Sequence, residues 1–313
     1  MELALDKYTG KSVSAEELWM IDPVDRFGYT CPGCQISVTP CSYRLKNKVR
    51  PYFSAKKNVH DPDCDVDGET KLIKRAKRQR ISTREGFPCR FPSRLVLKET
   101  RPVGAPNGAL TTSTRAEECH NEPQGMRKTQ RNLRWTAGTI RPICQTFIRY
   151  PYDRDLPLVV PGIQADRYQS VFQVLKRDQI LKYPTPCIFY APISWKKYIS
   201  TEELIEIQLG YGEWTERTLT RPYRVRVHWK EWSAARRNYV SSEIEISRLE
   251  CIEGKNRGDN TKGWLFFIGR QDENEPSLFH VMDHRLVCCV LAEMIYPLKP
   301  AKHEKKHISG FRP

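Results

Sequence analysis

Residues 29–67 read YTCPGCQISVTPCSYRLKNKVRPYFSAKKNVHDPDCDVD and decide how the N-terminal part of the chain folds. The segment holds a C-x-x-C pair followed by an H-x-x-x-C pair, and thiolate and imidazole are the ligands that zinc prefers. We therefore predict one zinc ion bound by Cys31, Cys34, His60 and Cys64. Four protein ligands leave no open coordination position, so the predicted site is structural and not catalytic. Cys41 lies close enough in sequence to replace one of the four ligands.

The sequence around these ligands predicts short strands and one short helix. Residues 26–30 and 49–54 have the composition of strands, and the residues after the C-x-x-C pair alternate between apolar and polar. Ser14 and Glu17 stand at the spacing of a capping box, which predicts a helix over residues 14–19. A module of this size buries little apolar surface, so bound metal is expected to supply much of its folding free energy. We predict a zinc β-ribbon domain over residues 1–70.

Positive charge is concentrated in one part of the chain. Residues 71–150 carry 18 Lys and Arg against 5 Asp and Glu, a net charge of +13, whereas residues 1–70 have a net charge of −2. Such a concentration favours binding to nucleic acid or another polyanion, and the alternative is a solvated basic linker. The run KLIKRAKRQR, residues 71–80, has no helix breaker and fits a basic helix. The residues predicted to contact phosphate there are Lys71, Lys74, Arg75, Lys77, Arg78 and Arg80.

Composition divides the remainder of the chain. Residues 71–138 are predicted to form a basic, partly disordered linker, because the segment GAPNGALTTSTRAEECHNEPQG within it lacks periodicity. Residues 139–300 are predicted to form an α+β domain, and residues 301–313 a basic tail. The predicted fold class is therefore α+β, with a small N-terminal zinc β-ribbon, a basic linker, and a C-terminal, mostly antiparallel β domain with flanking helices.

Periodicity predicts the elements of the C-terminal domain. Residues 166–180 and 280–296 are predicted to be helices, and His280, His284 and Cys288 on the second helix are interpreted as packing or surface residues. Strands are predicted over residues 186–195, 204–209, 223–229, 240–249 and 263–269.

One of these strands carries a second group of cations. The run RPYRVRVHWKEW, residues 221–232, places Tyr223 and Val225 on one face of a strand, and Arg224 and Arg226 on the other face. We predict that Arg224 and Arg226 contact a phosphate backbone. The alternative is an ordinary sheet with a solvated polar face.

Catalytic patterns are scarce. The sequence contains no G-x-S-x-G, P-loop, G-x-G-x-x-G or H-E-x-x-H motif. Glu253 and Lys255 match part of an acidic-x-Lys nuclease pattern, and Glu245 is the acidic residue nearest to a preceding strand. These three residues are weak candidates for a magnesium-dependent site, so the sequence leaves open whether the chain is an enzyme.

The N-terminal block resembles the zinc-ribbon start of competence-protein CoiA-like proteins. The resemblance covers about 40 residues and rests on three motifs: Tyr29-x-Cys31-Pro32-x-Cys34, Arg50-Pro51-Tyr52-Phe53-Ser54, and His60-x-x-x-Cys64. In that family the ribbon often precedes a restriction-endonuclease-like nuclease domain, which implies DNA cleavage with magnesium. In this chain the cationic run and the linker stand where that domain would continue, so the resemblance implies a role in handling nucleic acid.

The predicted function is a zinc-containing nucleic-acid-binding protein, with DNA or RNA as its partner and phosphate contacts from the basic segment. The alternatives are a divergent magnesium-dependent nuclease of the CoiA-like type, or a subunit of a larger nucleic-acid-processing complex. No run of 18 apolar residues is present, and the N-terminus lacks the features of a signal peptide. We therefore expect a cytoplasmic protein without a membrane span, whose cysteines bind metal or remain reduced.

Overall fold

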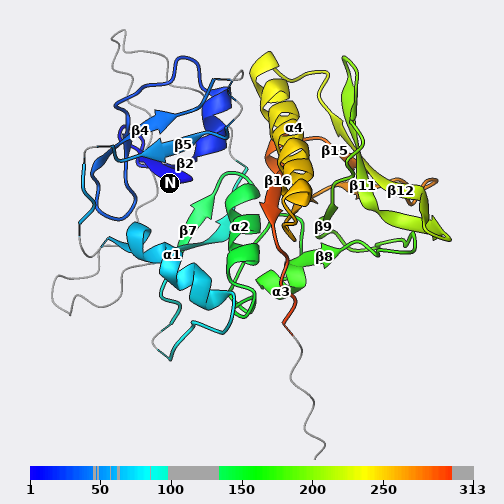
Figure 1. The fold of residues 1–313 in the computed structure, drawn as a ribbon, viewed down its shortest axis with the longest axis horizontal. Coiled ribbons are helices and arrows are strands. Elements are labelled where there is room, and N and C mark those ends of the chain that lie inside the picture. Colours follow the sequence, from blue (N-terminus) through cyan, green and yellow to red (C-terminus); the bar gives the residue numbers. More distant parts are fainter. Residues whose placement is uncertain are drawn as a thin grey trace, which may run out of the picture.

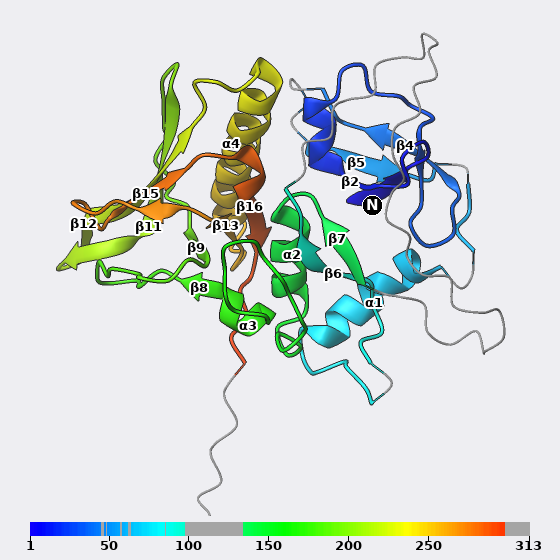
Figure 2. The same cartoon turned by 180° about the vertical axis from the view of Figure 1, so that it is seen from behind.

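The computed structural model describes residues 1–44, 47, 49–56, 58–61, 64–84, 86–97 and 134–297. The fold is α+β, with mostly antiparallel sheets and few helices (Figure 1), which confirms the predicted class. The predicted tail and most of the predicted linker lie outside the described residues. Seen from either side, the N-terminal sheet and the first helix lie to one side of the central helices, and a long twisted hairpin lies to the other (Figure 2).

The N-terminal module is a five-stranded antiparallel sheet with strand order β2-β1-β3-β4-β5. Its strands are β1 (Leu3–Asp6), β2 (Ser12–Ser14), β3 (Tyr29–Thr30), β4 (Ser37–Cys41) and β5 (Tyr52–Ser54). The 3₁₀ helix η1 (Ala15–Met20) follows β2, where the capping box predicted a helix. A small apolar core that includes Tyr29, Val38 and Phe53 lies under the sheet. The sequence predicted strands near β3 and β5 and an alternating segment at β4, whereas β1 and β2 were not predicted.

The described part of the predicted linker is folded into the body of the protein. Helix α1 (Asp65–Ala76) is followed by β6 (Phe91–Leu95), which pairs in parallel with β7 (Arg134–Ala137). Ile81, Phe87 and Phe91 are buried in one core with residues from the C-terminal part. The linker prediction is wrong for these residues. Their apolar side chains are widely spaced among polar residues, so the sequence shows neither a helical nor a strand period there.

A four-stranded sheet separates two apolar cores. Its order is β16-β13-β9-β8, and the strands are β8 (Phe172–Val174), β9 (Ile188–Pro192), β13 (Lys262–Phe267) and β16 (Val287–Ala292). Along β13, Trp264 and Phe266 enter one core, whereas Leu265 and Phe267 enter the other. A strand buried on both faces needs a continuous apolar run, which is what residues 264–267 provide.

The second core is closed by a sheet with the order β10-β11-β12-β15-β14. Its strands are β10 (Ile199–Ser200), β11 (Leu204–Thr215), β12 (Thr218–His228), β14 (Arg270–Gln271) and β15 (Leu278–Val281). Strands β11 and β12 form the long hairpin visible at the right of Figure 1. Along β12, Tyr223, Val225 and Val227 are completely buried, and the residues between them are not, which confirms the predicted alternation.

The remaining helices are α2 (Arg141–Arg149), α3 (Tyr168–Val171), α4 (Ala234–Asn256) and the 3₁₀ helix η2 (His284–Leu286). None of the described helices is both long enough and apolar enough to cross a membrane.

Three predicted elements of the C-terminal domain are wrong. The predicted strand 240–249 lies inside α4, where Val240, Ile244, Ser247 and Cys251 are buried at helical spacing. The predicted helix 280–296 comprises β15, η2 and β16, because its valines and cysteines fill both faces of a buried strand. The predicted helix 166–180 is a single turn, α3, followed by β8.

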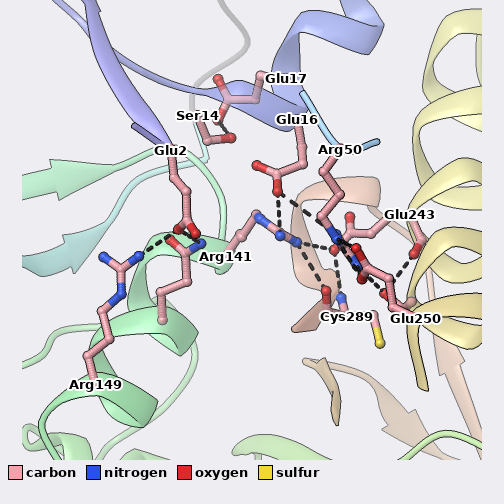
Figure 3. Close-up of polar contacts among 12 residues, drawn as sticks. Glu2, Ser14, Glu16, Glu17, Arg50, Arg141, Arg149, Glu243, Glu250 and Cys289 are labelled. Atoms are coloured by element: carbon pink, nitrogen blue, oxygen red, sulfur yellow. Dashed lines mark hydrogen bonds and ion pairs between the residues drawn. The ribbon is translucent and has the colours of Figure 1, made fainter. Parts of the chain in front are cut away.

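A buried ion cluster joins the N-terminal module to the rest of the protein (Figure 3). The guanidinium of Arg141, at the start of α2, is 3% exposed. It donates to Glu16 of η1 at 2.5 Å, to Glu243 of α4, and to the Cys289 carbonyl of β16. A further ion pair crosses the same interface. Both carboxylate oxygens of Glu250, on α4, accept hydrogen bonds from the guanidinium of Arg50. One guanidinium thus contacts three elements that are far apart in the sequence.

At the edge of the same interface, Glu2, the residue before β1, binds two side chains of α2. Its carboxylate accepts hydrogen bonds from Gln145 and Arg149, each at 2.6 Å. Arg141, Gln145 and Arg149 are four residues apart, so one face of α2 is turned toward the N-terminal module.

We predict that Arg141→Met lowers the free energy of unfolding by about 3–5 kcal/mol, because it leaves two carboxylates buried without their cation. The matched control is Arg149→Met, which breaks the half-exposed pair with Glu2 and is expected to cost less than about 1 kcal/mol. Urea denaturation of the two variants and the unmodified chain provides the measurement. Equal losses for the two variants would contradict a special role for Arg141.

We also predict a pH-dependent effect of Glu17. Burial raises the pKa of this carboxyl from 4.5 to about 7, even though hydrogen bonds from the Ser14 side chain and N–H act to lower it. A raised carboxyl pKa means that the folded state binds the proton more tightly, so this contribution to stability is full below pH 4.5 and is lost as the pH rises toward 7. Glu17→Gln cannot ionise and therefore avoids this loss. In urea denaturation, its free energy of unfolding relative to the unmodified chain is expected to be higher at pH 8 than at pH 5. The same difference in free energy of unfolding at pH 5 and at pH 8 would contradict the raised pKa of Glu17.

Candidate metal centre

The four predicted ligands come together at one end of the N-terminal sheet. The ligand atoms of Cys31, Cys34, His60 and Cys64 all lie within 4.8 Å of one another. Cys31 and Cys64 are buried, and Cys34 and His60 are partly buried. No other cluster of three or more potential metal ligands is found within the described part of the chain.

The separations between these atoms fit a tetrahedral ion. With ordinary zinc–sulfur and zinc–nitrogen bonds, a tetrahedron has S···S edges of about 3.8 Å and S···N edges of about 3.6 Å. The sulfurs of Cys31 and Cys64 are 3.7 Å apart, and Nδ1 of His60 lies 3.3 Å from the sulfur of Cys34 and 3.5 Å from that of Cys64. The group therefore has the donor types and the spacing needed to hold one metal ion.

Backbone hydrogen bonds shape the turn that carries the first two ligands. The N–H of Cys31 donates to the Ile36 carbonyl at 2.8 Å, which closes the end of the β3–β4 ladder, and the N–H of Gln35 donates back to the Cys31 carbonyl at 3.0 Å. Gln35 has a φ of +63°, and this left-handed residue reverses the chain after Cys34. The N–H of Gly33 also points at the Cys31 sulfur, at 3.4 Å.

The second ligand pair leads directly into α1. Cys64 is the N-cap residue of this helix, and its own N–H donates to the Asp61 carbonyl at 2.9 Å. The free N–H groups of a helix N-terminus favour negative charge, and the sulfur of Cys64 stands at this end of α1. The position of α1 is thus tied to the position of a potential metal ligand.

The electrostatics of the site favour the thiolate form of Cys34. Burial acts to raise its pKa, but hydrogen bonds from the backbone N–H groups of Ile36 and Asp61, and from the side chains of His60 and Cys64, outweigh that effect and lower the pKa to about 6. Thiolates are the form that binds metal.

Cys41, the alternative ligand left open by the sequence, lies outside the cluster. Its sulfur contacts the Thr39 carbonyl at 3.6 Å, near the far end of β4. The geometry therefore favours the set that contains both His60 and Cys64.

We predict that the purified chain binds one zinc ion, that Cys34→Ser abolishes stoichiometric binding, and that the matched change Cys41→Ser leaves it intact. Zinc is measured by elemental analysis after gel filtration, and its release by a chromogenic chelator. Loss of zinc in Cys41→Ser with retention in Cys34→Ser would contradict the ligand set.

The predicted phosphate-contacting residues of the basic run are all exposed and lie along or just after α1. The opposite side of the helix packs into the core through Ala76, with Leu72 and Ile73 beside it. Arg80 differs from the others, because it forms ion pairs with Asp153 and Asp155. Among the side chains that the structure describes, which exclude those of residues 65–70, no acidic one forms an ion pair with Lys71, Lys74, Arg75, Lys77 or Arg78.

Arg224 and Arg226 lie on the outer face of β12, as predicted, but their charges are already compensated. Arg226 binds Glu206 of β11 at 2.6 Å, and Arg224 binds both Glu206 and Glu275. Cross-strand pairing of this kind is the ordinary way in which a polar sheet face is stabilised. These two arginines are therefore less available to a phosphate than the exposed cations of α1.

The three weak catalytic candidates all lie on α4 and do not converge. Glu245 binds Arg248, and Glu253 is exposed more than two helical turns further on. The ammonium of Lys255 lies 3.9 Å from the ring centre of Trp195. A nuclease core requires acidic residues on adjacent strands, and the helical conformation of this segment places them along one helix instead.

Two polar groups were missed by the sequence analysis. The Arg141 cluster joins residues more than 100 positions apart, and no local sequence pattern predicts such a contact. A chain of hydrogen bonds also runs from Asp272 through His280 to His228. The alternation of residues 221–232 indicated that His228 lies on the outer face of a strand. His280 was predicted to lie on a helix, and no sequence pattern pointed to Asp272.

Comparisons with known proteins give no relative. No protein-family model, no curated protein and no solved structure matches the chain. The resemblance to CoiA-like proteins therefore stays a prediction from the sequence motifs.

Proposed function

We propose that this chain is a zinc-containing nucleic-acid-binding protein, in which a structural metal ion positions a basic helix against phosphates. One observation carries the proposal: Cys64 is both a member of the cluster of potential metal ligands and the N-cap of α1, the helix that displays the exposed cations. Ion binding would fix the start of the helix, and the apolar side of the helix would fix its remainder against the core.

The cations of this segment form a stripe. Lys71, Lys74, Arg75 and Arg78 are three or four residues apart, so they share one face of the helix and of the turn that follows it. The apolar residues of α1 lie on the opposite face. Lys74, Arg75 and Arg78 also line a shallow hollow in the surface. We call these four residues the α1 stripe.

The length of the α1 stripe suits a phosphate backbone. The seven residue steps from Lys71 to Arg78 span about 10 Å at the rise of a helix, and successive phosphates of one DNA strand advance about 3.4 Å along the axis. Several phosphates therefore fall within reach of four long side chains. Contacts to phosphate position a nucleic acid without reading its sequence, so the proposed binding is largely independent of sequence.

The metal ion in this proposal is structural. Its chemistry is to hold three thiolates and one imidazole in place, and the protein residues make the contacts to nucleic acid. The ten described cysteines form no disulfide, which supports a reducing compartment such as the cytoplasm.

We predict that the triple variant K71E/K74E/R78E weakens binding to single- and double-stranded DNA and RNA by more than 10-fold. It is also expected to reduce the slope of log K against log salt concentration by about 2–3, since each lost phosphate contact removes about 0.7–0.9 from the slope. Fluorescence anisotropy with labelled oligonucleotides over a range of salt concentrations provides the measurement.

The matched control changes the net charge by the same amount elsewhere on the surface. Lys196, Lys197 and Arg217 are exposed cations away from α1, and K196E/K197E/R217E is expected to keep most of the binding. Equal weakening by both triple variants would show that only overall charge matters. Binding that does not depend on salt, or no binding at all, would contradict the proposed function.

A further inference from the structure

A second group of potential metal ligands lies on the opposite side of the molecule from the Cys and His cluster. His228 is the last residue of β12, and His280 lies on the neighbouring strand β15. The two strands are parallel, with Arg226 opposite His280, so His228 lies two residues further along on the same face. Val227 and Val281 fill the core on the other face, and the two imidazoles therefore face outward.

The imidazole of His280 is held by a carboxylate that is itself fixed. Asp272 follows β14, and its Oδ1 accepts hydrogen bonds from the N–H groups of Asn274 and Glu275, both at 2.9 Å. Its Oδ2 lies 3.1 Å from Nε2 of His280. A carboxylate on one ring nitrogen selects the tautomer that carries the proton there, so Nδ1 of His280 presents its lone pair on the other side.

That lone pair points at the ring of His228. Nδ1 of His280 and Nε2 of His228 are 2.9 Å apart. Two neighbouring nitrogen ligands of an octahedral ion with bonds of about 2.1 Å lie about 3.0 Å apart. A carboxylate that orients a ligating histidine through its second nitrogen is the usual outer-shell arrangement of metal sites. An ion bound to both nitrogens displaces the proton that the two rings share, and it lies to one side of the line that joins the nitrogens.

The two rings open onto a hollow of about 430 Å³ that also includes Asp272, Glu273 and Met282. This space accommodates the water molecules or further ligands that an ion with two protein nitrogens requires. The nearby cations are compensated, because Arg226 binds Glu206, and Arg270 binds Glu273.

We propose that His228 and His280 form an open, two-imidazole site for a divalent transition-metal ion, with Asp272 as the positioning carboxylate. The site differs from the Cys and His cluster in two ways. It has nitrogen ligands alone, and it leaves most coordination positions to water or to an added ligand.

The test uses the full-length chain already loaded with one equivalent of zinc. Titration with Ni²⁺ by isothermal calorimetry is expected to show one further ion per chain, with a micromolar dissociation constant. A zinc indicator in a parallel titration confirms that the first zinc stays bound. His228→Gln and His280→Gln are each expected to abolish the second binding event, and Asp272→Asn to weaken it by about 10- to 100-fold.

The matched control is a second pair of histidines in the same chain. His303 and His307 are four residues apart in the basic tail, and H303A/H307A removes both. This control is expected to keep the Ni²⁺ affinity of the unmodified chain. Loss of binding in H303A/H307A, or unchanged binding in both His228→Gln and His280→Gln, would overturn the proposal. Thermal melts that match the unmodified chain show that the glutamine variants are folded.

Discussion

The position of the N-terminal module depends on the buried guanidinium of Arg141. A charge that is 3% exposed is stable only beside opposite charges, and its partners Glu16 and Glu243 come from η1 and α4. Moving the module away from α4 would leave at least one charge buried without a partner. Arg50 and Glu2 extend the same interface with further ion pairs on either side. The interface therefore specifies one relative position of the module and the two-core body.

This constraint gives α1 two fixed ends. Its first residue follows Cys64 of the ligand cluster, and its last residue, Ala76, is buried in a core shared with α2 and β13. Arg90, which comes after the helix, donates to the Pro32 carbonyl in the turn between Cys31 and Cys34. In the proposed complex with nucleic acid, a basic helix held in this way would lose little conformational entropy, because its cations are already arranged on one rigid element. The metal centre and the basic surface are thus parts of one arrangement.

The sequence predicted features that depend on short spacings. The cluster of Cys31, Cys34, His60 and Cys64 was found because zinc ligands occur in close pairs, and the alternation along β12 was found because a strand repeats every two residues. The α4 segment was misassigned because Ile244 and Ile246 alternate like a strand, whereas burial follows Val240, Ile244, Ser247 and Cys251 at helical spacing. The Arg141 cluster and the Asp272–His280–His228 chain join distant residues, and a single sequence carries no signal for such contacts. Nucleic-acid binding itself stays a prediction.

The central claim is that the metal ion orders the N-terminal sheet and the start of α1 while the two-core body folds without it. Hydrogen–deuterium exchange, followed by mass spectrometry on the zinc-loaded and the chelator-treated chain, tests this most directly. Removal of the metal is expected to raise exchange in β3, β4 and the first turns of α1, and to leave β9 and β13 protected. Unchanged protection of β4 and α1 after confirmed metal removal, or loss of protection throughout β9 and β13, would contradict the account.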